Sequence, residues 1–193
     1  EHPITELVTG VDIVKEQILV ADGSKLSLTQ ADVEFRGHAI EFRINAEDAA
    51  KNFMPSPGVV HTYSEPRLPW TRIDSACYQG YQILPFYDSL LAKLIVWGRT
   101  REEAIVRGKI ALSSYDIKGV ATTIPFQLAI LDDSKFRAGE MTTKYVEAEL
   151  IKTFIAKHQA ALAAGSVVAE KKTADSATTE ITPSAPKTTR NFD

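Results

Sequence analysis

The stretch His38-Ala39-Ile40-Glu41-Phe42-Arg43-Ile44-Asn45 alternates two kinds of side chain along the backbone. Successive side chains of a strand point to opposite faces, so residues 38, 40, 42 and 44 share one side and residues 39, 41, 43 and 45 share the other. The first set is mostly apolar, whereas the second contains the charged residues Glu41 and Arg43. We therefore predict a β-strand within 33–45 that has one buried face and one charged face.

The flanking segments predict an α+β fold with an antiparallel sheet and flanking helices. Before the strand, apolar residues recur at helical spacing over 3–20, with Pro3 suited to the first turn and an interruption near Gly10. After it, the prolines and the glycine of 55–58 enforce turns. The further elements expected are strands at 59–63, 72–78 and 117–121, helices at 100–114, 125–131 and from 142 through 149 toward 163, and a buried strand or short buried helix at 90–97.

Composition and charge exclude several classes of protein. The 193 residues carry a net charge of −3, so we expect no basic surface that binds nucleic acid. No apolar run approaches the roughly 18 residues that span a bilayer, and the N-terminus has no signal-peptide pattern, so we expect neither membrane insertion nor export. The single cysteine, Cys77, can form no internal disulfide, which agrees with a reducing, cytoplasmic compartment.

The two ends of the sequence differ from its middle. Glu1 is followed at once by a helix-entry signal, which indicates that the sequence starts within a domain. Beyond Gly165 the composition is dominated by Ala, Thr, Ser, Lys, Pro and Glu. These residues include few large apolar groups, and their burial could not offset the entropy lost when the chain is ordered. We therefore expect a disordered tail or linker at 165–193.

Two charged residues of the predicted strand are the best candidates for chemistry. Glu41 and Arg43 are two residues apart and point to the same face, and an arginine presents a planar fork that can bind an oxyanion. An ordinary cross-strand salt bridge is the alternative that the spacing leaves open. Glu1 can act as a base or simply place a favourable charge at a helix N-terminus. His38 is in phase with the apolar residues and is expected in the core.

Common ligand-binding motifs are missing from the sequence. It contains no GxxxxGK[ST] phosphate loop, no GxGxxG and no group of His, Cys and carboxylate residues at metal-ligand spacing. On the residues alone, the chain is an α+β domain whose function is not assigned.

A series of motifs, taken together and in order, resembles biotin carboxylases. They are EHPITE at 1–6, GVD at 10–12, KEQ at 15–17, GHAIEFRINAED at 37–48, PSPG at 55–58, YDSLLAKL at 87–94, GVATT at 119–123 and FRAG at 136–139. The resemblance implies the end of an ATP-grasp domain at 1–32, the biotin carboxylase C-terminal domain at 33–150 and a helical extension at 151–164, before the tail at 165–193.

The resemblance also implies a two-step reaction. Bicarbonate attacks the γ-phosphate of ATP to give carboxyphosphate, which then delivers carbon dioxide to the ureido nitrogen of biotin on a carrier protein. In this family Glu1 matches the base that deprotonates bicarbonate, and Arg43 matches the partner of the biotin ureido oxygen. Glu41 becomes a supporting neighbour of Arg43.

Ligands and partners follow from the same resemblance. The family's phosphate loop and its ligands for Mg²⁺ or Mn²⁺ precede the EHP motif, so we expect no metal ligand in this chain and no turnover by the fragment alone. The expected partners are a biotin carboxyl carrier protein, a second copy in the full-length protein, and the carboxyltransferase subunit. The final acceptor, whether acetyl-CoA, propionyl-CoA, pyruvate or another compound, is not encoded in these residues.

Two other interpretations remain open at this point. Another ATP-grasp ligase, such as the carbamoyl-phosphate synthetase large subunit, shares the fold and the carboxyphosphate intermediate but lacks the GHAxExRINAED strand. A non-catalytic module that dimerises or docks the carrier would keep the apolar elements without an ATP site.

Overall fold

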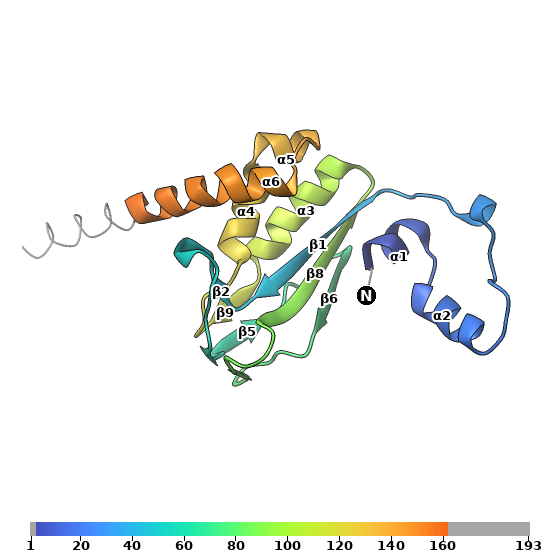
Figure 1. The fold of residues 1–193 in the computed structure, drawn as a ribbon, viewed down its shortest axis with the longest axis horizontal. Helices are drawn as coiled ribbons and strands as arrows, with labels where there is room; N and C mark the ends of the chain where they lie inside the picture. Colours follow the sequence, from blue (N-terminus) through green and yellow to red (C-terminus); the bar gives the residue numbers. More distant parts are fainter. Residues whose placement is uncertain (1–2, 162–193) are drawn as a thin grey trace, which may run out of the picture. The chain divides into compact units, whose positions relative to one another are not determined.

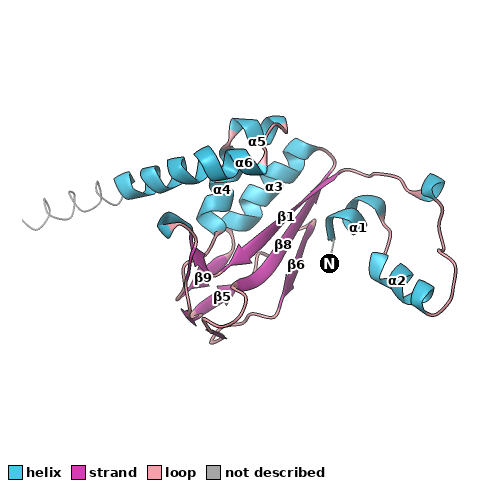
Figure 2. Ribbon diagram, viewed as in Figure 1, coloured by secondary structure: helices cyan, strands magenta, loops and turns pink. Residues whose placement is uncertain are grey.

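The centre of the fold is a three-stranded antiparallel sheet with the strand order β1-β8-β6. The computed structural model describes residues 3–161, and Figures 1 and 2 show this sheet together with its helices. Its strands are β1 (His38–Asn45), β8 (Leu90–Gly98) and β6 (Thr71–Ser75). The predicted α+β class is confirmed, and the apolar run at 90–97 is a strand rather than a helix.

The pairing of β1 with β8 decides which side chains share a face. Phe42 lies opposite Leu94, and Ile44 lies opposite Ala92. Directly opposed residues point the same way, so these four side chains belong to one apolar face. The regular register is interrupted between Ile44 and Asn45, and such an irregularity bends a strand.

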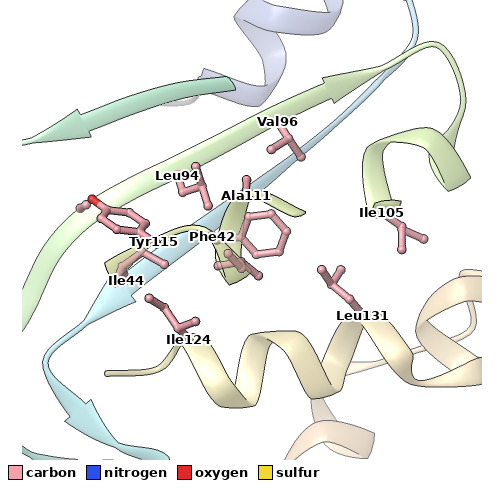
Figure 3. Packing of buried hydrophobic residues seen from close by; sticks show 11 residues of the cluster. Phe42, Ile44, Leu94, Val96, Ile105, Ala111, Tyr115, Ile124 and Leu131 are labelled. Atoms are coloured by element: carbon pink, nitrogen blue, oxygen red, sulfur yellow. The ribbon is translucent and has the colours of Figure 1, made fainter. Parts of the chain in front are cut away.

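Two helices cover the apolar face of the sheet, close to where they were predicted. They are α3 (Arg101–Ser113) and α4 (Ile124–Asp132), and Figure 3 shows Leu131 of α4 pointing toward Phe42 of β1. The main buried cluster contains Phe42, Ile44, Ala92, Leu94, Val96, Ile105, Ala111, Leu112, Tyr115, Ile124 and Leu131. A Cβ atom on Gly108 of α3 would lie 2.7 Å from Cζ of Phe42, so a glycine is what lets α3 approach β1 this closely.

A side-chain cap starts α3. The hydroxyl of Thr100 accepts a hydrogen bond of 3.2 Å from the backbone N–H of Glu103, which satisfies one of the free donors at the helix N-terminus. Thr100→Ala is therefore expected to lower the free energy of unfolding by about 1 kcal/mol in urea titrations. Thr100→Ser should keep most of that free energy, and an equal loss in both variants would show that the cap does not stabilise α3.

Three two-stranded ladders accompany the main sheet in the described part of the chain. They pair β2 (Glu47–Asp48) with β3 (Met54–Pro55), β4 (Gly58–Val59) with β7 (Gln82–Ile83), and β5 (Thr62–Ser64) with β9 (Asp116–Lys118). The strands predicted at 59–63 and 117–121 therefore meet through β5 and β9. The strand predicted at 72–78 is the shorter β6, which pairs with β8.

Two short helices, α1 (Pro3–Thr9) and α2 (Ile13–Ala21), lie at the start of the described chain. Gly10 between them has a φ of +73°, which ends α1 and explains the predicted interruption. α1 contacts β1 and β8, and its residues Pro3 and Val8 are buried. A 3-10 turn (Gln30–Asp32) and irregular chain lead to β1, which starts at His38 and not at Val33.

Helical segments complete the described chain. They are a 3-10 turn (Ala49–Lys51), α5 (Ser134–Ala138), α6 (Thr143–Tyr145), a π-helical turn (Val146–Leu150) and a helix over 151–161. The helix predicted from residue 142 is confirmed, although its π-helical turn was not predicted. A compact unit ends at Ile155, and residues 156–161 belong to a second one. The predicted tail at 165–193 and the last residues of the predicted extension at 151–164 lie outside the described residues.

A pair of tyrosines joins β5 to the end of α3. The hydroxyl oxygens of Tyr63 and Tyr115 lie 2.5 Å apart, and the Tyr63 hydroxyl donates to Oγ of Ser75 at 2.6 Å. Burial raises the pKa of Tyr115, and its hydrogen bond with Tyr63 raises that pKa further. The neutral form of Tyr115 is therefore the form that the fold stabilises.

Tyr115→Phe is expected to make stability less sensitive to high pH. A raised folded-state pKa gives a contribution that is complete below the unfolded pKa of about 10 and is lost as the pH rises above it, because the unfolded chain then ionises first. Phenylalanine removes this titration, so the fall of unfolding free energy above pH 10 should be shallower by about 1.4 kcal/mol per pH unit. Urea titrations at several pH values measure the slope, with Tyr87→Phe as the control because Tyr87 is 79% exposed. Equal slopes in Tyr115→Phe and the wild type would contradict this role.

Candidate functional site

The face of the sheet that points away from α3 carries rows of charged side chains. Lys93 of β8 lies opposite Arg43 of β1 on one side and opposite Asp74 of β6 on the other. The adjacent row contains Glu41, Ile95 and Arg72 in the same strand order. Opposed residues share a face, so three strands bring together five charged residues that lie far apart in the sequence.

Ion pairs connect most of these charges. Nζ of Lys93 lies 3.9 Å from Oε1 of Glu41. Nε of Arg72 donates to Oδ1 of Asp74 at 2.8 Å, and its Nη1 lies 3.7 Å from Oε2 of Glu6 in α1. The hydrogen bond to Asp74 raises the pKa of Arg72. α1, which contacts β1 and β8, therefore covers part of this face, and Ile95 of β8 on the same face is 0% exposed.

Arg43 differs from its neighbours because its guanidinium makes no hydrogen bond or ion pair with any other residue of the part 3–161. Its backbone is held firmly, since its carbonyl oxygen accepts hydrogen bonds from Nε2 of Gln127 at 2.6 Å and from Oγ1 of Thr123 at 3.1 Å. The side chain is exposed. β1 thus presents a cation with free donors from a fixed backbone, which is the arrangement that binding an oxyanion requires.

A hydrogen-bonded cluster fixes the chain where β1 ends, two residues beyond Arg43. Nδ2 of Asn45 donates to Oε1 of Glu47 at 3.0 Å and to Oγ of Ser89 at 3.2 Å. Ser89 in turn donates to Glu47 at 2.5 Å, and its carbonyl oxygen accepts from the backbone N–H of Ala46 at 2.8 Å. The RINAED and YDS motifs are therefore joined directly, and both support the strand that carries Arg43.

Open space borders the charged row beside Lys93 and Asp74. A cavity of about 380 Å³ lies there and is also lined by Cys77, Tyr81 and Leu91. A ligand that reaches this row therefore has room on the side of β6 and β8.

Comparison with known proteins assigns the family. Residues 41–148, more than half of the chain, match the family described as the biotin carboxylase C-terminal domain. The chain belongs to this family. Biotin carboxylase 1 of Bacillus subtilis is 57% identical over 147 residues, which are 76% of this chain and 33% of that protein. The biotin carboxylase of a Nostoc species is 52% identical over 147 residues, which are 76% of this chain and 33% of that protein.

Solved structures of biotin carboxylases have the same fold. The biotin carboxylase domain dimer of Hydrogenobacter thermophilus 2-oxoglutarate carboxylase, in complex with MgADP, ADP and bicarbonate, matches with a TM-score of 0.74 and 48% identity over 78% of this chain and 34% of that chain. The complete multifunctional pyruvate carboxylase from Rhizobium etli matches with a TM-score of 0.75 and 38% identity over 78% of this chain and 16% of that chain. The chain thus spans about a third or less of the length of the relatives described here.

Membership in the biotin carboxylase C-terminal domain family confirms the resemblance drawn from the motifs, and the structure adds where the candidate residues lie. Glu41 and Arg43 share the charged face as predicted, but the carboxylate of Glu41 pairs with Lys93. Glu41 thus forms the kind of cross-strand salt bridge that the spacing left open, whereas Arg43 forms none within 3–161. Glu1, the candidate base, lies outside the described residues.

One sequence prediction about this biotin carboxylase domain is wrong. His38 was expected in the core, but it is exposed. It lies opposite Gly98 at the last pair of the β1–β8 ladder, beyond the reach of the core cluster. A residue that is in phase with apolar residues is still not buried where its strand extends past the helices that cover the sheet.

Neither a metal cluster nor a membrane span occurs in the described part of the chain. Among the residues that the structure describes, no three His, Cys, Asp or Glu side chains come close enough together to hold a metal ion. None of the helices within 3–161 is both long and apolar enough to cross a membrane.

Proposed function

We propose that this chain is the C-terminal part of a biotin carboxylase, and that the whole protein carboxylates biotin on a carrier protein with ATP and bicarbonate. The observation that carries the proposal is the guanidinium of Arg43, which has no ion-pair partner within 3–161 and lies on the charged face of the sheet, within a domain of this family. The motif match of Arg43 to the family's biotin-binding arginine supports the same role.

In the proposed reaction Arg43 stabilises charge on the biotin ureido group. The phosphate that is released together with carbon dioxide accepts the ureido proton, which leaves a negative charge shared with the ureido oxygen. The nitrogen then attacks carbon dioxide to form an N–C bond. Two N–H donors of a guanidinium fit such an oxygen well, and their attraction to it grows as the negative charge develops. Arg43 therefore lowers the energy of the anion that reacts.

Carbon dioxide arises in the preceding proposed step. Bicarbonate takes the γ-phosphoryl group of ATP, which releases ADP, and the carboxyphosphate formed splits into carbon dioxide and phosphate. Glu1 is the proposed base for the bicarbonate proton, on its motif match alone. The Hydrogenobacter relative binds ADP, magnesium and bicarbonate, and we propose that the present protein binds ATP with Mg²⁺ or Mn²⁺. In the family the phosphate loop and the metal ligands precede the EHP motif, so we expect no turnover from these 193 residues alone.

A biotin carrier and a carboxyltransferase complete the proposed assembly. Neither methionine of this sequence precedes a lysine, because Met54 is followed by Pro55 and Met141 by Thr142. The biotinylated lysine of a Met-Lys-Met motif is therefore not among these residues, and we propose that a biotin carboxyl carrier protein presents it. A carboxyltransferase would receive the carboxyl group, and we propose a homodimer of the whole protein, in line with the dimer of the Hydrogenobacter relative.

Labelled bicarbonate tests the function. A protein extended upstream to the length of its relatives is expected to incorporate the label into biotin only when ATP is present. Incorporation that depends on ammonia or glutamine and ignores biotin would favour a carbamoyl-phosphate synthetase instead. Binding of a biotinylated carrier domain without any turnover of the extended protein would favour a docking module.

A further inference from the structure

Glu41 lies within reach of two cations on the charged face. It is two residues from Arg43 on the same side of β1, and Lys93 of β8 lies directly opposite Arg43. Like charges opposed across two strands are unfavourable unless an anion lies near them. The one carboxylate of β1 on this face can therefore pair with either the lysine or the arginine.

In the structure Glu41 forms its ion pair with Lys93. Their ion pair measures 3.9 Å, and the side chains are only 22% and 19% exposed. Such partial burial strengthens the attraction relative to a pair in bulk water. Asp74, the carboxylate that lies opposite Lys93 on β6, is engaged by Arg72 at 2.8 Å. Lys93 thus has Glu41 as its ion-pair partner within 3–161, while Arg43 has none there.

We propose that Lys93 is a positioning residue, which holds the carboxylate of Glu41 and so keeps the guanidinium of Arg43 free for the anionic ureido oxygen of biotin. This inference rests on the proposed function. A carboxylate that swings onto Arg43 would occupy the same donors that the ureido oxygen needs. The ion pair of Lys93 prevents this competition without Lys93 touching the substrate.

Charge removal at Lys93 tests the proposal. In the extended protein, Lys93→Met keeps the length and apolar stem of the side chain but releases Glu41. We expect kcat/KM for biotin to fall roughly fivefold, mainly through a higher KM, because the competing pair has the strength of a partly exposed ion pair. ATP cleavage that depends on bicarbonate but not on biotin should stay at the wild-type rate, since Arg43 does not serve that step.

The decisive result is a rescue. Lys93→Met combined with Glu41→Gln is expected to return to within roughly twofold of the wild-type kcat/KM, because a neutral amide competes weakly for a guanidinium. Lys93→Arg keeps the ion pair and should also retain the rate. Lys118→Met is the control, since Lys118 pairs with Asp116 on another ladder at 3.1 Å.

Two outcomes would overturn the role of Lys93. One is an unchanged KM for biotin in Lys93→Met, and the other is a loss that Glu41→Gln does not restore, as a purely structural role would give. If Lys93→Met does not fold, Lys93→Gln carries the same expectations. Absence of biotin carboxylation by the wild type would instead refute the proposed function, so the two failures are distinguishable.

Discussion

Arg43→Ala is expected to lower kcat/KM for biotin by roughly 10²- to 10³-fold in the extended protein. The guanidinium is the one cation among the five charged residues of this face that has no ion-pair partner within 3–161, and its backbone is fixed by Gln127 and Thr123. Alanine removes both the charge and the fork, so the ureido anion would form without a partner. Incorporation of labelled bicarbonate into biotin under single-turnover conditions measures the loss.

Two matched variants separate this role from a general loss of charge. Arg67→Ala removes an exposed arginine from the loop between β5 and β6 and should keep the wild-type rate. Arg43→Lys keeps one positive charge but loses the planar fork, so an intermediate rate is expected. Equal rates for Arg43→Ala and Arg67→Ala would remove Arg43 from the reaction.

Leu94→Ala is expected to lower the free energy of unfolding by about 3 kcal/mol. Leu94 is 0% exposed at the middle of the central strand β8, and it belongs to the main buried cluster. The side chain lies opposite both Phe42 and Ile73, so neighbours on two strands would border the cavity. Removing buried methyl groups costs their transfer free energy together with the cost of that cavity.

Urea unfolding measures the effect of Leu94→Ala, with Val106→Ala on the half-exposed side of α3 as the control. Val106 is 46% exposed, so its truncation should change the free energy by no more than about 0.5 kcal/mol. Similar losses in the two variants would show that the sheet is not the centre of the core.

The sequence predicted the elements that have a clear period. The alternation in 38–45 indicated both the strand and its two faces, and Thr100 with the acids after it indicated the start of α3. The 90–97 run was ambiguous, because a strand that is buried on both faces has no alternation to detect. Here α3 covers one face of β8, and α1 covers part of the other.

Pairings between distant residues were not predictable in the same way. The sequence placed Arg43 and Glu41 on one face, but it did not show that Lys93 joins them, because that depends on the register between β1 and β8. The assignment of Arg43 to biotin came from the family motif and not from spacing. The boundaries predicted at residues 32 and 150 also stay predictions, although the family match at 41–148 lies within them.

The central claim is that Arg43 acts on biotin and not on ATP. Cleavage of ATP by the extended Arg43→Ala variant, measured with bicarbonate in the presence and absence of biotin, tests this most directly. Cleavage without biotin is expected to continue at the wild-type rate, while the increase on adding biotin is expected to be lost. An unchanged increase on adding biotin would contradict the account and leave Arg43 as a surface charge of the sheet.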